Sequence, residues 1–147
     1  MSDVYREDPV LPELDRSVLV VGLNGKLFGL ERATGEPRWS FELPGWQRGE
    51  VFLAIRYGLV VASSHVDSIS ALDYLTGTLR WTSATTQSGR ATIVVEHDVI
   101  VCAKNGYLDC YDHQGARRWA QPLSGQGLGR AALGFPGNVA QADDVGR

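Results

Sequence analysis

The chain has few of the features that mark membrane, secreted or nucleic-acid-binding proteins. No apolar run is long enough to cross a bilayer. The N-terminal segment, MSDVYREDPVLPELD, has neither the basic region nor the apolar core of a signal peptide. The whole chain has a net charge of −3 and offers no basic stripe to neutralise the phosphates of a nucleic acid. These absences argue against membrane and nucleic-acid partners and predict a cytoplasmic location, by default in a bacterium.

Cysteine is also scarce, and the two that occur predict free thiols. If Asn105-Gly106 is the centre of a hairpin turn, Cys102 and Cys110 lie on adjacent strands but point to opposite faces. A disulfide would then require a register slip. A metal site would need cysteine and histidine in a tighter cluster, because the three histidines are scattered along the chain. We therefore expect two buried thiols and no metal.

What the sequence does contain is a block that occurs three times. The copies read LFGLERATGEPRW, SISALDYLTGTLRW and YLDCYDHQGARRW, at residues 27–39, 68–81 and 107–119. A second marker, a glycine that opens an apolar segment, falls at Gly49, Gly89 and Gly129, each 40 residues from the next. A period near 40 with several short strands per unit predicts an all-β fold made of β-propeller blades of four antiparallel strands.

The strands of each unit can be ordered from a, the innermost, to d. Asn-Gly pairs between apolar runs, at Asn24-Gly25 and Asn105-Gly106, predict tight hairpins between b and c. The glycine-led segments open each strand a, and the Arg-Trp segments form each strand d. This order gives strands b to d of a first blade at 17–43, complete blades at 49–85 and 89–123, and one closing strand a at 129–135. Residues 1–16 are expected to form an N-terminal arm and 136–147 a C-terminal tail.

This strand order predicts an assembly of more than one chain. Three blades fall short of the roughly four to eight that close a propeller, and an open arc would expose two apolar blade faces. We expect a homodimer that forms a six-bladed ring, in which the closing strand of one copy completes the first blade of the other. Alternatively, a strand within residues 4–14 completes that blade locally, although Pro9 and Pro12 suit an edge or an extended arm better.

The middle block carries a recognisable pattern, A-x-D-x-x-T-G-x-x-x-W, formed by Ala71, Asp73, Thr76, Gly77 and Trp81. It resembles the tryptophan-docking motif of the pyrroloquinoline-quinone-like repeat family, which includes quinoprotein dehydrogenases and many non-enzymatic propellers. The other two blocks keep the glycine and the tryptophan and depart at other positions. The resemblance implies that each tryptophan stacks on a neighbouring blade near a glycine turn. The docking residues would be Trp39, Trp81, Trp119, Gly35, Gly77 and Gly115.

The resemblance does not extend to the chemistry of quinoprotein enzymes. Those enzymes use a ring of eight blades, a calcium or lanthanide site, a catalytic aspartate and often a vicinal disulfide. Calcium needs about six to eight oxygen ligands in one place, whereas Glu31, Asp73 and Asp112 occupy equivalent repeat positions and would be spread around the ring. We therefore expect a protein that is not an enzyme and has no cofactor, with a degenerate quinoprotein enzyme as the least favoured alternative.

Three charged residues remain as candidates for binding. Glu50, Arg90 and Arg130 each follow the glycine that opens a strand a, so they would gather at the mouth of the axial channel. There the arginines could bind a carboxylate, a phosphate or an acidic peptide end, or Glu50 could simply neutralise them. Trp46, which lies outside the repeat, could contact a partner. We expect a non-catalytic scaffold for an unidentified protein partner, with a binder of small anions as the alternative.

Overall fold

The computed structural model describes residues 15–45 and 49–142, and every regular element in these residues is a strand. Three antiparallel sheets of three or four strands follow one another along the chain, and a two-stranded sheet follows them. The first contains β1 (Val18–Leu23), β2 (Lys26–Glu31) and β3 (Pro37–Glu42). The second contains β4 (Phe52–Arg56), β5 (Leu59–Ser63), β6 (Ser68–Asp73) and β7 (Leu79–Ala84). The third contains β8 (Ala91–Val95), β9 (Ile100–Lys104), β10 (Tyr107–Tyr111) and β11 (Arg117–Gln121).

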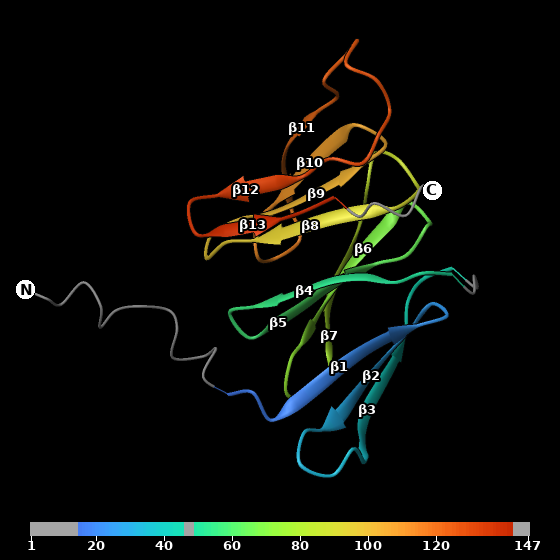
Figure 1. Ribbon diagram of the computed structural model, residues 1–147, viewed down its shortest axis with the longest axis vertical. Coiled ribbons are helices and arrows are strands. Elements are labelled where there is room, and N and C mark those ends of the chain that lie inside the picture. Colours follow the sequence, from blue (N-terminus) through green and yellow to red (C-terminus); the bar gives the residue numbers. More distant parts are fainter. Residues whose placement is uncertain (1–14, 46–48, 143–147) are drawn as a thin grey trace, which may run out of the picture.

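The sheets stack along the long axis of the molecule, with the second between the first and the third (Figure 1). Strands β4 and β8, which are the first strands of their sheets, contact each other. Each complete sheet has its strands in chain order, as a propeller blade does. The predicted fold class, all-β with four-stranded antiparallel blades, is confirmed. Among the described residues, no helix has the length and apolar character needed to cross a bilayer.

Both predicted Asn-Gly hairpins form. Asn24 and Gly25 have φ angles of 51° and 77°, and Asn105 and Gly106 have 49° and 80°. A type I′ turn needs positive φ at both central residues, and asparagine followed by glycine tolerates this better than other pairs. The turn at Asn105 also fixes the register, which places the buried, free thiols of Cys102 and Cys110 on opposite faces of the sheet, as expected.

The C-terminal part differs from the expected single strand followed by a tail. Strand β12 (Leu133–Phe135) pairs with a further strand, β13 (Asn138–Ala140), through a turn in which Gly137 has a φ of 76°. The side-chain amide of Asn138 donates to the carbonyl of Val95 at 2.7 Å and to Glu96 at 2.6 Å. These bonds tie the hairpin to the end of β8, so residues 138–140 form the second strand of a fourth unit.

The hydrophobic core lies between the blades. One cluster joins the first and second blades, a second joins the second and third, and a third lies between the third blade and the C-terminal hairpin. Strands β5, β8 and β9 are buried at every position, which explains why their sequences do not alternate and are apolar except at Ser63, Thr92 and Lys104. Strand β11, the outer strand of the third blade, is exposed at every position. The outer strands of the first two blades, β3 and β7, are likewise exposed at four of their six positions.

Candidate functional site

Two tryptophans join consecutive blades. The indole N–H of Trp39, on β3, donates to the carbonyl of Tyr74 in the second blade at 3.1 Å. A Cβ placed on Gly77 would lie 2.3 Å from Trp39 Cδ2, so only glycine leaves room for the ring. The hydrogen bond satisfies the one polar group of the indole, and the apolar face of the ring covers the contact between the two blades.

The joint between the second and third blades repeats this geometry. The indole of Trp81, on β7, donates to the carbonyl of His113 at 2.8 Å. A Cβ on Gly115 would lie 2.6 Å from Trp81 Cδ2. Gly77 and Gly115 have φ angles of 73° and 90°, a conformation that residues with a side chain rarely adopt. Each tryptophan thus contacts the glycine turn of the following blade.

A small residue lies across the ladder from each tryptophan. Gly29 pairs with Trp39, Ala71 with Trp81, and Cys110 with Trp119. A Cβ on Gly29 would come within 2.3 Å of the Trp39 ring, so the indole lies against its own sheet as well as the next. This contact gives a physical reason for the small first position of the repeated pattern.

One tryptophan, Trp119, and one glycine turn, at Gly35, have no such contact between blades within the described part of the chain. Trp119 retains 48% of its exposure. A Cβ built on Gly35, whose φ is 79°, would have no described atom within 4 Å. Trp119 is on β11 of the third blade, and Gly35 lies between β2 and β3 of the first; the second blade lies between these two (Figure 1). Of the six predicted docking residues, the structure brings Trp39, Trp81, Gly77 and Gly115 into contact and leaves these two apart.

Two of the three acidic residues of the repeat, Asp73 and Asp112, hold turns with their side chains. Asp73 accepts hydrogen bonds from the backbone N–H and the hydroxyl of Thr76, at 3.0 and 2.9 Å. Burial would raise the pKa of Asp73, but the bonds from Thr76 and Arg80 outweigh it and lower the pKa below 3.8. For Asp112, backbone hydrogen bonds, chiefly from Ala116, lower the pKa. Nowhere in the described residues do three or more His, Cys, Asp or Glu side chains form a group that could hold a metal ion.

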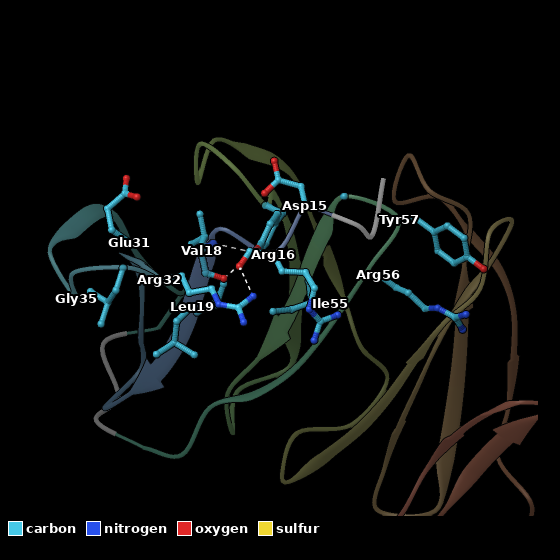
Figure 2. A pocket seen from close by; sticks show the side chains of 14 residues that line it. Asp15, Arg16, Val18, Leu19, Glu31, Arg32, Gly35, Ile55, Arg56 and Tyr57 are labelled. Atoms are coloured by element: carbon cyan, nitrogen blue, oxygen red, sulfur yellow. Dashed lines mark hydrogen bonds between the residues drawn. The ribbon is translucent and has the colours of Figure 1, made fainter. Parts of the chain in front are cut away.

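A cleft of about 540 Å³ lies at the free edge of β1, between the first and second blades (Figure 2). Among the described strands, β1 pairs only with β2, so this is the place where the first strand of that blade would lie. The hydroxyl of Tyr74 accepts from the N–H of Val18 at 2.9 Å and donates to its carbonyl at 2.6 Å. Tyr74 therefore provides hydrogen bonds for the backbone groups at the start of the β1 edge. Leu19, the next residue of β1, is 57% exposed.

The three predicted channel-mouth residues lie together. Arg90 Nη2 lies 2.9 Å from Glu50 Oε2, and His65 Nε2 lies 3.1 Å from Glu50 Oε1. The guanidinium carbons of Arg90 and Arg130 lie 6.0 and 5.7 Å from the centre of the Phe52 ring. The ring of His65 meets that of Phe52 edge-on at 5.5 Å. We call these five residues the rim cluster.

The rim cluster contains two members that sequence reasoning missed, Phe52 and His65. Phe52 opens β4, whose equivalence to β8 in the repeat was visible, whereas His65 lies in a loop outside the repeat pattern. The pairing of Glu50 with Arg90 has the geometry expected if the cluster neutralises itself. Trp46, the remaining candidate, lies outside the described residues.

A buried lysine, not among the residues predicted from the sequence, holds the loop that carries His65 of the rim cluster. Lys104 is 2% exposed, and its ammonium donates to the carbonyls of Ser64 and Val66 at 3.0 and 2.6 Å. Burial lowers its pKa below 10.5. Asp109, equally buried, accepts from the N–H and hydroxyl of Thr86. Both residues fix loops of the second blade against the third.

Four-stranded antiparallel blades, joined by tryptophans on glycine turns, define the chain as a β-propeller protein of the pyrroloquinoline-quinone-like repeat class that its sequence resembles. More specifically, the chain belongs to the family described as outer membrane protein assembly factor BamB, whose model matches residues 7–142.

Individual relatives agree with this assignment. The outer membrane protein assembly factor BamB of Nitrosomonas eutropha is 30% identical over 130 residues, which cover 77% of this chain and 32% of the relative. The crystal structure of BamB from Moraxella catarrhalis is 26% identical with a TM-score of 0.56, covering 71% of this chain and 33% of that one. A europium-containing methanol dehydrogenase, 16% identical with a TM-score of 0.54 over 71% and 23% of the two chains, shares the fold alone. The chain spans about a third of the length of these BamB relatives.

The expected cytoplasmic location is wrong. The family and the relative in Nitrosomonas eutropha are both described as outer membrane protein assembly factors, which conflicts with a cytoplasmic location. The expectation depended on the missing signal-peptide pattern in MSDVYREDPVLPELD. Such an absence carries no information about where a protein works.

Proposed function

We propose that this chain is a non-catalytic β-propeller scaffold that binds other proteins during outer membrane protein assembly. The observation that carries the proposal is the family match over residues 7–142. The site geometry supports it, because Asp73 and Asp112 hold turns and Trp39 and Trp81 join blades. Propellers are rigid and present many loops, which suits a role in contacting several surfaces.

The proposal can be tested in the source organism. Deleting the gene is expected to lower the amount of correctly assembled outer membrane protein in isolated membranes. Re-expression of the chain should restore that amount, whereas the Gly77→Ala chain, whose blade joint is blocked, should not. An unchanged amount after deletion would contradict the proposed function.

We propose further that the scaffold is a homodimeric ring. Support comes from the three blades within one chain and from the exposed Trp119 and the unoccupied Gly35 turn, which no other described residue matches. A second copy would bring the total to six blades, within the usual range of about four to eight. Sedimentation equilibrium at micromolar concentration is expected to give twice the chain mass of 16.0 kDa. A species of 16.0 kDa would refute the ring.

The rim cluster supports a second function, the binding of a small anion or an acidic peptide end. Two guanidinium groups and His65 lie around the Phe52 ring, and Glu50 pairs with Arg90 and His65. Calorimetric titration with inorganic phosphate and with acetate tests this function. Binding should be lost in Arg130→Gln and kept in Arg80→Gln, which lies on the outer strand β7. Absence of heat in the unmodified protein would rule it out.

A further inference from the structure

We propose that the rim cluster and a polar cleft beside it bind an acidic segment of a partner protein, whose carboxylate side chain takes the place of Glu50 between Arg90 and His65. This inference rests on the second proposed function, the binding of an anion. It goes further by naming the chemistry of the ligand, the surface that takes its backbone and the residue that competes with it. It follows from the contacts of Glu50 and from two loops that the third blade fixes.

The carboxylate of Glu50 shows how this cluster holds an acid. One oxygen, Oε1, lies 3.1 Å from His65 Nε2, and the other, Oε2, lies 2.9 Å from Arg90 Nη2. The carboxylate thus bridges an imidazole of the second blade and a guanidinium that precedes the first strand of the third. The side chain of a glutamate or aspartate from a partner can make the same two contacts.

Glu50 can be displaced because its ion pairs are exposed. Its side chain is 49% exposed, that of His65 is 42% exposed and that of Arg90 is 28% exposed. Ion pairs in contact with water contribute little to stability, since water solvates each charge well when its partner leaves. An incoming carboxylate therefore exchanges one such pair for another, and Glu50 lowers the affinity by competing for the same cations.

The ring of Phe52 concentrates positive charge at this site. The guanidinium carbons of Arg90 and Arg130 lie 6.0 and 5.7 Å from its centre, and the ring of His65 meets it edge-on at 5.5 Å. Attraction between each cation and the aromatic ring offsets part of the repulsion between the two guanidinium groups. Such a group of cations favours acidic ligands over neutral ones.

The loop that carries His65 is preorganised. The buried ammonium of Lys104 donates to the carbonyls on both sides of His65, at 3.0 and 2.6 Å. The carbonyl of His65 itself accepts from the N–H of Gly89 at 2.7 Å. Gly89 directly precedes Arg90, so the imidazole and the guanidinium come from backbone segments that are bonded to each other. Little conformational freedom remains to be lost when a ligand binds between them.

A polar cleft of about 520 Å³ adjoins the rim cluster. It lies between two loops and is lined by His65, Val66, Asp67, Thr86, Gln87 and Ser88. The second loop is also fixed, because Thr86 donates to the buried Asp109. The carbonyl of Ser88 accepts from the side-chain amide of Asn105 at 3.0 Å. A polar lining suits a peptide backbone, which has a donor and an acceptor at nearly every residue. The negative charge of Asp67 leaves the rim cluster as the place for the carboxylate.

The experiment is calorimetric titration of the whole chain with acetyl-Gly-Glu-Gly-amide, whose carboxylate is on a side chain. Glu50→Gln removes the competing charge and keeps the shape, so it should tighten binding by about 5-fold or more. Glu31→Gln is the matched control, because Glu31 is 43% exposed and is paired with Arg38 at 3.4 Å. It lies at the opposite end of β2 from the turn that bonds to Gly49, so it should leave the dissociation constant unchanged.

Further titrations test the ligand and the cleft. Acetyl-Gly-Gln-Gly-amide, which has no charge, should not bind. Acetate should bind more weakly than the glutamate peptide, because it leaves the cleft empty. Gln87→Ala should weaken binding of the peptide and leave binding of acetate unchanged, with circular dichroism to check that each variant stays folded. Acetyl-Gly-Gly-Gly, whose carboxylate is the chain end, should bind more weakly than the glutamate peptide, and equal or tighter binding would overturn the assignment to a side chain.

The outcomes separate this inference from the function on which it rests. If the unmodified protein binds the glutamate peptide or acetate but Glu50→Gln does not tighten binding, competition by Glu50 is refuted and the anion-binding function stands. If the peptide binds no more tightly than acetate, or Gln87→Ala changes neither constant, the cleft is not part of the site. If the unmodified protein binds neither ligand, the anion-binding function fails, and this inference fails with it.

Discussion

The glycine turns allow the energy of one tryptophan joint to be isolated. Gly77 and Gly35 occupy the same turn position with φ angles of 73° and 79°, so alanine at either position incurs the same backbone strain, about 1 kcal/mol. At Gly77 the new Cβ would also lie 2.3 Å from Trp39 Cδ2, against 3.4 Å or more for an ordinary contact. At Gly35 it would meet no described atom within 4 Å.

The indole must therefore move by roughly 1 Å when Gly77 becomes alanine. Overpacking of this kind costs about 1–3 kcal/mol. The movement also weakens the hydrogen bond from Trp39 to Tyr74, which contributes about 1 kcal/mol. We expect Gly77→Ala to lower the free energy of unfolding by about 3–5 kcal/mol and Gly35→Ala by about 1 kcal/mol.

Urea unfolding, followed by tryptophan fluorescence, measures both values through the midpoint and slope of each transition. The measurement belongs at a concentration low enough to keep the chain monomeric, because dimerisation would stabilise the unmodified protein by mass action. Equal losses for the two variants would refute this reasoning, because they would show that the contact between Trp39 and Gly77 contributes nothing to stability.

Three further outcomes are expected. Tyr74→Phe should lower the free energy of unfolding by about 2 kcal/mol, because it leaves the buried backbone N–H and carbonyl of Val18 without a partner. Tyr107→Phe is the control, since no hydrogen bond of its hydroxyl occurs among the described residues. Lys104→Met should cost about 2–4 kcal/mol in urea unfolding by orphaning two carbonyls of the loop at 64–67, and a loss below 1 kcal/mol would indicate that water replaces the ammonium. Because the folded-state pKa of Asp73 is lowered, its stabilising contribution is present above pH 3.8 and disappears as the pH falls through the folded-state value. Asp73→Asn should therefore flatten the dependence of stability on pH in that acidic window, and an unchanged profile would contradict this assignment.

The sequence predicted the features that are encoded locally. The blades follow from the repeated blocks, and the hairpins follow from Asn-Gly pairs whose φ preference does not depend on tertiary contacts. The convergence of Glu50 with Arg90 could also be predicted, because equivalent positions of consecutive blades are neighbours in space. The energetic role of that pair is a separate matter that only binding measurements address.

The features that were missed depend on contacts between units. Strand β13 is three residues long, and the hydrogen bonds of Asn138 to the end of β8 hold it in place. Lys104 reads as an ordinary strand-end lysine until the loop of the neighbouring blade closes over it. Tyr74 follows the repeated acidic residue, and only the stacking of blades shows that its hydroxyl caps β1.

The tryptophan joint shows why one repeat does not fold by itself. Each joint takes its tryptophan from one repeat and its glycine turn from the next, so the joint forms only when consecutive blades stack. Among the described residues, Trp119 and the Gly35 turn are the two halves that no internal joint uses.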